Sequence, residues 1–335
     1  MIRSTNSKEP SSQAQVLVAE DLGKSYGPRT ALRGLSFSLK AGHVMGFLGP
    51  NGAGKTTAIR ILTTMMEPSS GDFFVDGISS KHPEKIRSRI GALPESLGFP
   101  KQITAIEYLT FFGRLYGRTA AEARTNGMAL LEEMGLQQRA RSLIGTYSRG
   151  MRQRLGIARV LVNDPAVVFL DEPTLGLDPR GQQELLSMIQ RIARERNVGV
   201  VLCSHLLSEI EGVCDDVIIL SSGHVVAAGS AAEVLGQAQR DGIRIRVPSP
   251  SATEAQHILE ALPNVMKVIP TGDMTGWLRV ELVGPTNGTA PEDDYANNRI
   301  LDALIRAEIP ILTFEAKGGG RLQEVFLHLT EEAIK

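Results

Sequence analysis

The sequence predicts an α/β fold for residues 16–239, followed by a smaller α+β domain over residues 240–335. Three observations carry this prediction. Apolar strand-like runs alternate with helical patterns through the first part of the chain, a glycine-rich loop follows one of these runs, and the order of the patterns changes after about Arg240. Several of the runs are continuously apolar, which is typical of strands buried on both faces of a sheet.

The strand candidates of the first part fall into two classes. Leu35–Leu39 alternates, as a half-exposed antiparallel strand does, whereas others are apolar throughout. In chain order the candidates are Val16–Glu20, Leu35–Leu39, Val44–Leu48, Asp72–Asp76, Ile90–Leu93, Val167–Leu170, Val198–Cys203 and Val217–Leu220. Between Ala105 and Arg159 the apolar spacing is helical, most clearly in Tyr108–Tyr116 and Ala129–Met134. This predicts an α-helical subdomain inserted between sheet strands.

After Arg240 the patterns follow the order strand, helix, strand, strand, helix, strand. The strands are Ile243–Val247, Val265–Ile269, Trp277–Val283 and Ile311–Glu315, and the helices are Ala252–Leu262 and Ile300–Ala307. This order is that of a ferredoxin-like split βαβ unit. A final helix, Leu322–Ala333, is expected after the glycine run Gly318–Gly320.

The composition limits the class of protein. A chain of 335 residues is long enough for two domains. The formal net charge of −1 and the pI of about 6.6 argue against a nucleic-acid partner bound through a basic surface. The polar N-terminus, residues 1–15, lacks the apolar core of a signal peptide and predicts a disordered tail, and no apolar run approaches the roughly 18 residues of a membrane span. Cys203 and Cys214 lie in apolar contexts, which predicts buried thiols in a reducing compartment.

The glycine-rich loop Gly49–Thr57 fits the pattern G-x-x-x-x-G-K-[ST] and follows the strand Val44–Leu48. Its small residues let backbone N–H groups approach phosphate oxygens, and a helix starting near Lys55 points its positive end at the same anion. Lys55 can reach the β- and γ-phosphates, and the Thr56 hydroxyl can hold Mg²⁺. The predicted nucleotide-binding residues of the loop are Gly49, Asn51, Gly52, Gly54, Lys55, Thr56 and Thr57.

A second nucleotide signal is the strand Val167–Leu170, which ends in two carboxylates. Asp171 can hold Mg²⁺ through water, and Glu172 can orient or deprotonate the water that attacks the γ-phosphate. An acidic strand end alone is weak evidence. It becomes strong evidence when a phosphate loop precedes it in the chain.

A third element is the segment Tyr147–Arg154, which precedes a helical run. Ser148 is a natural N-cap and Gly150 permits close backbone approach, so this helix start is suited to phosphate. Alone, the segment would fit an ordinary capped helix equally well.

With these elements in this order, residues 16–235 resemble the ATP-binding cassette (ABC) family. Tyr26 matches the aromatic residue that stacks on adenine in this family, and Gly49–Thr57 matches its Walker A motif. Ser148–Met151 matches the signature motif, and Asp171 and Glu172 match Walker B with its catalytic glutamate. Gly176–Asp178 matches the D-loop, and Ser204-His205 matches the switch histidine. Two departures are visible. Glu95 stands where the family usually has Gln, and the signature reads Tyr-Ser-Arg-Gly-Met instead of LSGGQ.

The resemblance implies a P-loop NTPase cassette with a mixed sheet core, an antiparallel β subdomain and an α-helical subdomain. It implies ATP and Mg²⁺ as cofactors, with Lys55, Glu172 and His205 in catalysis and Thr56, Glu95 and Asp171 at the metal. The departures and the tail from Leu322 to Thr330 resemble bacterial drug, antibiotic and polysaccharide-type export ATPases, whose membrane subunits form a separate chain.

In that family two cassettes meet head to tail, so that Ser148 and Gly150 would serve the ATP of the other cassette. Asp178, in the D-loop, is also counted among the nucleotide-binding residues. The implied partners are separate transmembrane permease subunits and a second copy or a homologous ATPase subunit, at the cytoplasmic face of the cell membrane. The loop from Glu95 to Lys101 and the helices after it are the expected docking surface.

Alternatives remain open on the sequence alone. The chain could be a non-transport ABC ATPase of the assembly, repair or translation type, or a regulatory module with a decayed site. Tyr26 could be a packed loop aromatic, His205 a strand-end histidine without a ligand, Asp178 a turn residue or N-cap, and Glu95 a solvent-facing loop residue.

Overall fold

In the computed structural model of the protein, the described residues are 14–96, 98–204, 212–234, 243–263, 265–270, 276–282 and 296–315. Their contacts divide them into one unit that ends at Ala231 and a second that begins at Ala232. The boundary expected at residues 239/240 and the helix expected at Leu322–Ala333 lie outside the described residues. The tail was expected to include Gln15, but this residue already pairs with Lys40 in an antiparallel ladder, so the first strand begins there.

The central sheet of the first unit has the strand order β10-β9-β3-β8-β7-β6. Its strands are β3 (Val44–Leu48), β6 (Ile90–Leu93), β7 (Val167–Asp171), β8 (Gly199–Cys203), β9 (Asp216–Ser221) and β10 (His224–Ser230). All neighbouring pairs are parallel except β9 and β10, so the sheet is mixed. β3 and β8 are buried over their whole length, which explains their continuous apolar sequences.

The strand β10 is absent from the sequence-based prediction. It pairs with β9 through a two-residue turn in which Ser222 has φ 49° and Gly223 has φ 83°. Two positive φ values match the twist that a tight antiparallel hairpin requires. The resulting strand is only half buried and therefore carries a weak apolar pattern.

A second sheet, of order β2-β1-β4-β5, forms the antiparallel subdomain. Its strands are β1 (Gln15–Tyr26), β2 (Arg29–Lys40), β4 (Ser70–Val75) and β5 (Ile78–Ser79). β1 extends well beyond the predicted Val16–Glu20, because it continues through irregularities in its pairing with β2 that interrupt the alternation. β4 ends one residue before the predicted end, at Asp76, whose φ of 50° turns the chain.

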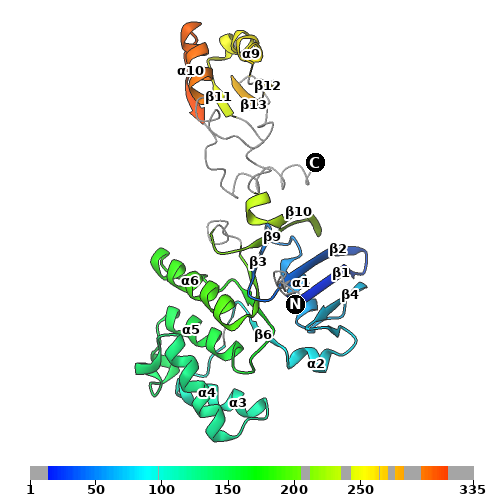
Figure 1. The fold of residues 1–335 in the computed structure, drawn as a ribbon, viewed down its shortest axis with the longest axis vertical. Helices are drawn as coiled ribbons and strands as arrows, with labels where there is room; N and C mark the ends of the chain where they lie inside the picture. Colours follow the sequence, from blue (N-terminus) through cyan, green and yellow to red (C-terminus); the bar gives the residue numbers. More distant parts are fainter. Residues whose placement is uncertain are drawn as a thin grey trace, which may run out of the picture. The chain divides into compact units, whose positions relative to one another are not determined.

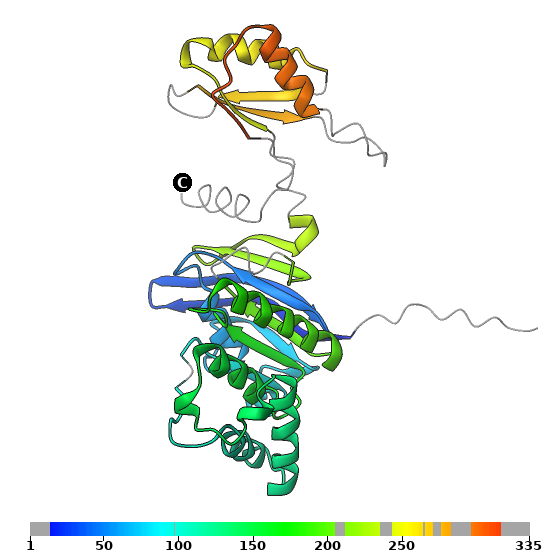
Figure 2. The same cartoon turned by 90° about the vertical axis from the view of Figure 1, so that its left-hand side faces the viewer.

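The helices of the first unit are α1 (Lys55–Leu62), α2 (Pro83–Arg87), α3 (Ala105–Leu115), α4 (Ala120–Glu133), α5 (Arg149–Val160) and α6 (Pro179–Arg196), with single 3₁₀ turns at Gln137–Arg139 and Ile144–Thr146. Reciprocal capping boxes fix the starts of α3 and α4, through Thr104 with Glu107 and Thr119 with Glu122. Figures 1 and 2 show α3, α4 and α5 gathered at one end of this unit. This group, between β6 and β7, confirms the predicted helical subdomain.

The second unit contains β11 (Ile243–Arg246), α9 (Ala252–Glu260), β12 (Val265–Pro270), β13 (Trp277–Leu282), α10 (Ala296–Arg306) and β14 (Thr313–Glu315), with a 3₁₀ turn at Ser249–Ser251. The strand order is β12-β13-β11-β14, and every pair is antiparallel. Figure 2 shows α9 and α10 on the same face of these strands. The order of elements confirms the predicted ferredoxin-like arrangement.

A chain that ends at Gln239 is expected to keep the fold of the first unit, because this unit has its own buried core around Leu17, Phe47 and Phe169. Thermal unfolding followed by circular dichroism should show one cooperative transition for the shortened chain. An insoluble shortened chain with no cooperative transition would mean that both units depend on one core.

Candidate functional site

A pocket of about 380 Å³ in the first unit gathers segments that lie far apart in the sequence. The phosphate loop supplies most of the lining. Glu95 comes shortly after β6, Asp171 is the last residue of β7, and Glu172 follows it. The lining residues are Tyr26, Arg29, Ala31, Asn51, Gly52, Ala53, Gly54, Lys55, Thr56, Thr57, Glu95, Asp171 and Glu172. Because β3, β6, β7 and β8 are parallel, their carboxyl ends meet at one edge of the sheet, where ligands of α/β proteins bind.

Glycine is required at two positions of the loop by close packing. A Cβ at Gly49 would lie 2.4 Å from the carbonyl oxygen of Leu220, and a Cβ at Gly54 would lie 2.6 Å from that of Ala31. Gly54 also has φ 109° and is the residue before helix α1. The backbone of the loop can therefore adopt this path only without side chains at these positions.

Lys55 is the first residue of α1 and is only 8% exposed. Its ammonium donates hydrogen bonds to the carbonyl oxygens of Gly49 and Pro50, the latter at 3.2 Å. These bonds hold the cation within the loop. Phosphate oxygens can replace neutral carbonyls as acceptors, since charge-assisted hydrogen bonds are the stronger ones.

The acidic edge of the pocket is formed by Asp171, Glu172 and Glu95. Burial raises the pKa of the Asp171 carboxyl, and the charge of Glu95 raises it further, while Lys55 and Arg60 act in the opposite direction. Glu95 therefore lies close enough to Asp171 for its charge to be felt there.

Glu172 is held in an unusual backbone conformation. Its φ is 49°, and its N–H donates to the carbonyl oxygen of Cys203 on β8 at 3.1 Å. A non-glycine residue in the left-handed region is uncommon and persists where the surroundings fix it. This conformation sets the direction of the carboxylate at the end of β7.

The donor atoms at this edge suit Mg²⁺. The Thr56 hydroxyl and the Asp171 and Glu95 carboxylates are oxygen ligands of the kind that this hard cation prefers. Within the described ranges, no three His, Cys, Asp or Glu side chains are grouped as a metal site. A metal at this edge would be held by one or two carboxylates together with nucleotide phosphates, which is the usual form of Mg²⁺ sites in nucleotide-binding proteins.

Tyr26 lies at the end of β1 and is 45% exposed. Its hydroxyl donates to the sulfur of Met66 at 3.0 Å, and the Lys24 ammonium lies 5.8 Å from its ring centroid. The first contact holds the hydroxyl end of the ring, and the lysine lies over one face, so the exposed ring has its other face for stacking. Arg29, which the sequence analysis did not select, pairs with Tyr26 across the β1–β2 turn and adds a cation to the same pocket.

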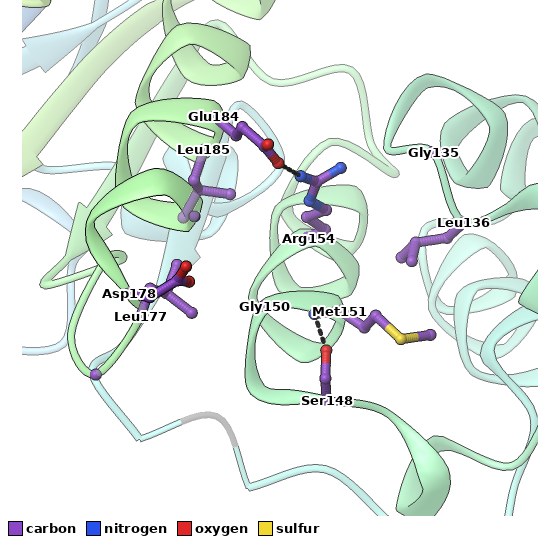
Figure 3. Close-up of a pocket in the computed structure, with 12 residues that line it drawn as sticks. Gly135, Leu136, Ser148, Gly150, Met151, Arg154, Leu177, Asp178, Glu184 and Leu185 are labelled. Atoms are coloured by element: carbon purple, nitrogen blue, oxygen red, sulfur yellow. Dashed lines mark hydrogen bonds and ion pairs between the residues drawn. The ribbon is translucent and has the colours of Figure 1, made fainter.

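Ser148, Gly150 and Asp178 line a different pocket, also of about 380 Å³ (Figure 3). Ser148 is the N-cap of α5, and its hydroxyl accepts from the Met151 N–H at 3.3 Å. Asp178 is the N-cap of α6 by position, although its side chain makes no capping bond. An ion pair of 2.9 Å between Arg154 and Glu184, which the sequence analysis also missed, connects α5 with α6.

The structure thus places the predicted site residues in two groups. Most lie in the pocket around Lys55, including Glu95, and Gly49 contributes its carbonyl to Lys55. Ser148, Gly150 and Asp178 form the second group, in the pocket between α5 and α6. His205 lies outside the described residues.

Cys203 and Cys214 are both buried and unpaired, as the sequence predicted. Burial raises the pKa of both thiols, and nearby carboxylates raise it further, Asp171 at Cys203 and Asp215 at Cys214. These thiols are therefore unreactive structural residues.

Comparisons with known proteins agree with this geometry. The sequence model of the ABC transporter family matches residues 32–175. Linearmycin resistance ATP-binding protein LnrL of Bacillus subtilis is 36% identical over 229 residues, which cover 68% of this chain and 73% of the relative. Daunorubicin/doxorubicin resistance ATP-binding protein DrrA of Streptomyces peucetius is 33% identical over 311 residues, which cover 92% of this chain and 90% of the relative.

Solved structures agree as well. The structure of cbiO1 from Clostridium perfringens, part of the ABC transporter complex cbiONQ, superposes with a TM-score of 0.63 at 27% identity, over 67% of this chain and 92% of that one. The structure of an ATP-binding subunit of an ABC transporter gives a TM-score of 0.59 at 30% identity, over 66% and 92%. These matches extend over about two thirds of the chain, whereas the similarity to DrrA extends over nearly all of it.

Replacing Lys55 with alanine removes a cation from the phosphate loop, so affinity for ATP is expected to fall by about 10-fold or more, with a parallel loss of turnover. Titration with a fluorescent ATP analogue measures the affinity. Lys85→Ala, which removes an exposed lysine from α2, is the control. Unchanged affinity in Lys55→Ala would mean that nucleotide binds elsewhere.

Proposed function

The chain belongs to the ATP-binding proteins of ABC transporters, and we propose that it works as a head-to-tail dimer, with a second copy or a homologous subunit, on separate permease subunits. As a member of this family, of the drug-exporter type, it binds and hydrolyses ATP to power membrane export. The relatives named as resistance and transport proteins disfavour a non-transport ATPase and a module with a decayed site.

The observation that carries the dimer proposal is the separation of the site into two pockets. The pocket around Lys55 offers the phosphate loop, the carboxylates and Tyr26. The pocket around Ser148 offers a capped helix start and the Gly176–Asp178 segment. In a head-to-tail pair, the second pocket of each chain completes the first pocket of the other, so that each ATP is enclosed from both sides.

The side chains of the first pocket divide the chemical work. Tyr26 stacks on the base, and Lys55 with the loop N–H groups holds the phosphates. Thr56, Asp171 and Glu95 hold Mg²⁺, which neutralises developing charge on the phosphoryl group when bound. Glu172 accepts a proton from the attacking water or orients it. The role of His205 as the switch histidine rests on the family pattern alone.

The surface proposed for the permease is the outer face of α3. Phe111, Leu115 and Tyr116 are 57%, 64% and 47% exposed there. Beneath them Phe99, Tyr108 and Phe112 form a chain of edge-to-face contacts with centroids 5.2 and 4.9 Å apart, which joins α3 to the loop after Glu95. Apolar side chains grouped on one exposed face favour a protein partner.

The proposed permease subunits would also attach this ATPase to the membrane. Within the part of the chain that the structure describes, no helix is both long and apolar enough to cross one. We propose that the protein lies at the cytoplasmic face of the cell membrane, held there by permease subunits, because its relatives are ATP-binding proteins of transport and drug-resistance systems.

Glu172→Gln keeps the shape of the side chain but removes the base. ATP should still bind while hydrolysis falls by about 10²–10⁴-fold, and an ATP-bound dimer should accumulate. Phosphate release and light scattering with ATP or ADP measure the two effects. Glu195→Gln, at an exposed position of α6, is the matched control. Near-normal turnover in Glu172→Gln would refute the role of Glu172.

Glu95→Gln restores the residue usual in the family and removes a charge that acts on Asp171. The ATPase rate, measured against Mg²⁺ concentration with the permease present, is expected to shift along the Mg²⁺ axis because a ligand charge is lost. Glu132→Gln, on the exposed side of α4, serves as the control. Superimposable curves for wild type and Glu95→Gln would place Glu95 outside the metal site.

A further inference from the structure

Arg149 occupies the signature position at which the related motif LSGGQ has glycine, and it is the first residue of α5. Its guanidinium lies against Gly176. A Cβ built on Gly176 would lie 2.4 Å from Cζ, 2.5 Å from Nη1 and 2.8 Å from Nε of Arg149. Three atoms of the planar group at similar distances indicate that its flat face packs on the glycine. No side chain fits between them, and Gly176 has φ 73°, a conformation that glycine adopts without strain.

Gly150 and Leu177 lie beside this packing and line the second pocket. Gly150 has no Cβ, and an added Cβ would lie 3.7 Å from Cδ2 of Leu177. The start of α5 therefore packs on the Gly176–Asp178 segment through Arg149, with Gly150 close to the same segment. Movement of the segment at Gly176 is expected to displace Arg149, because close-packed groups do not deform freely.

The same segment leads back to Glu172 through two turns. The Leu177 N–H donates to the Thr174 carbonyl at 3.0 Å, and the Leu175 N–H donates to the Glu172 carbonyl at 3.2 Å. Thr174 is only 1% exposed, which anchors the middle of the segment, whereas Gly176 at its tip is exposed. The position of Gly176 therefore depends on contacts with residues outside the segment, and Arg149 makes such a contact.

The positive charge of Arg149 does not explain why its guanidinium lies against Gly176. Within the described residues its guanidinium makes no hydrogen bond or ion pair, although it lies near the start of a helix, where a cation is unfavourable. Guanidinium is planar and weakly hydrated, so it packs on a flat surface in a way that the point charge of lysine does not.

We propose that Arg149 is a positioning residue for ATP hydrolysis. By packing on Gly176 it holds the segment that follows Glu172 and so acts together with the Cys203 hydrogen bond to keep the Glu172 carboxylate directed into the pocket of its own chain. Because Arg149 also belongs to the signature helix, this contact connects the surface offered to the second ATP with the base that acts on the first. The inference rests on the proposed role of Glu172.

The test separates turnover from binding in the full-length chain. Arg149→Ala is expected to lower kcat by about 10-fold, because small displacements of a catalytic group are costly, while KM for ATP and the ATP-driven dimer of Glu172→Gln change less than about twofold. Arg149→Lys should not restore turnover, since lysine keeps the charge but loses the flat face. Arg141→Ala, an exposed arginine of the same subdomain, is the charge-matched control.

A double-mutant cycle identifies the contact. Gly176→Ala places a methyl group where the guanidinium lies and also strains the backbone at φ 73°, so it should lower kcat at least as much as Arg149→Ala. Arg149→Ala combined with Gly176→Ala should cost clearly less than the product of the two single effects, because both remove one contact. Thermal melting of each variant checks that the fold is retained.

Three results would overturn the inference: unchanged kcat in Arg149→Ala, full recovery in Arg149→Lys together with weakened dimer formation in Arg149→Ala, or independent effects of the two substitutions. The second would mean that Arg149 acts on phosphate through its charge. Failure of the proposed function is a separate outcome, since it appears as normal turnover in Glu172→Gln whatever Arg149 does.

Discussion

The close approach of backbone to backbone around the phosphate loop is the constraint on which the rest of the site depends. Gly49 lies against the Leu220 carbonyl of β9, and Gly54 lies against the Ala31 carbonyl of β2. The loop is therefore clamped between the central sheet and the antiparallel sheet. Because this clamp also sets the start of α1, the position of Lys55 follows from the packing of three elements and not from its own bonds alone.

The charged groups around the phosphate loop are arranged to bind a ligand. Burial and the Glu95 charge oppose ionisation of Asp171, while the partners of the Lys55 ammonium among the described residues are backbone carbonyls. A ligand that brings a divalent cation to the carboxylates and anionic oxygens to the ammonium relieves both sides at once. Such a ligand also stabilises the folded chain by mass action, so binding and stability are coupled in this unit.

The sequence predicted those features that depend on local pattern or on motif spacing. The bounds of β3 and β6 match their apolar runs, and Ser148 caps α5 as expected. The sequence did not predict roles that depend on how separate elements are placed. Arg29 lines the nucleotide pocket because the β1–β2 turn places it opposite Tyr26. The Arg154–Glu184 pair forms because α5 and α6 lie side by side. The helix α6 is absent from the prediction, although Asp178 could be an N-cap as well as a turn residue and Pro at the first helical position favours a helix start.

Signature residues and catalytic residues occupy separate pockets of one chain, yet a short segment joins them. Arg149 packs on this segment at Gly176, and the segment returns through two turns to Glu172, which has a left-handed φ and a hydrogen bond to β8. In the proposed head-to-tail dimer, each chain completes the site of the other, and this segment would connect the state of one pocket with the proposed base in the other. The departure from glycine at position 149 would then have a physical reason, because the Arg149 guanidinium at the start of α5 packs on the exposed tip of the segment at Gly176.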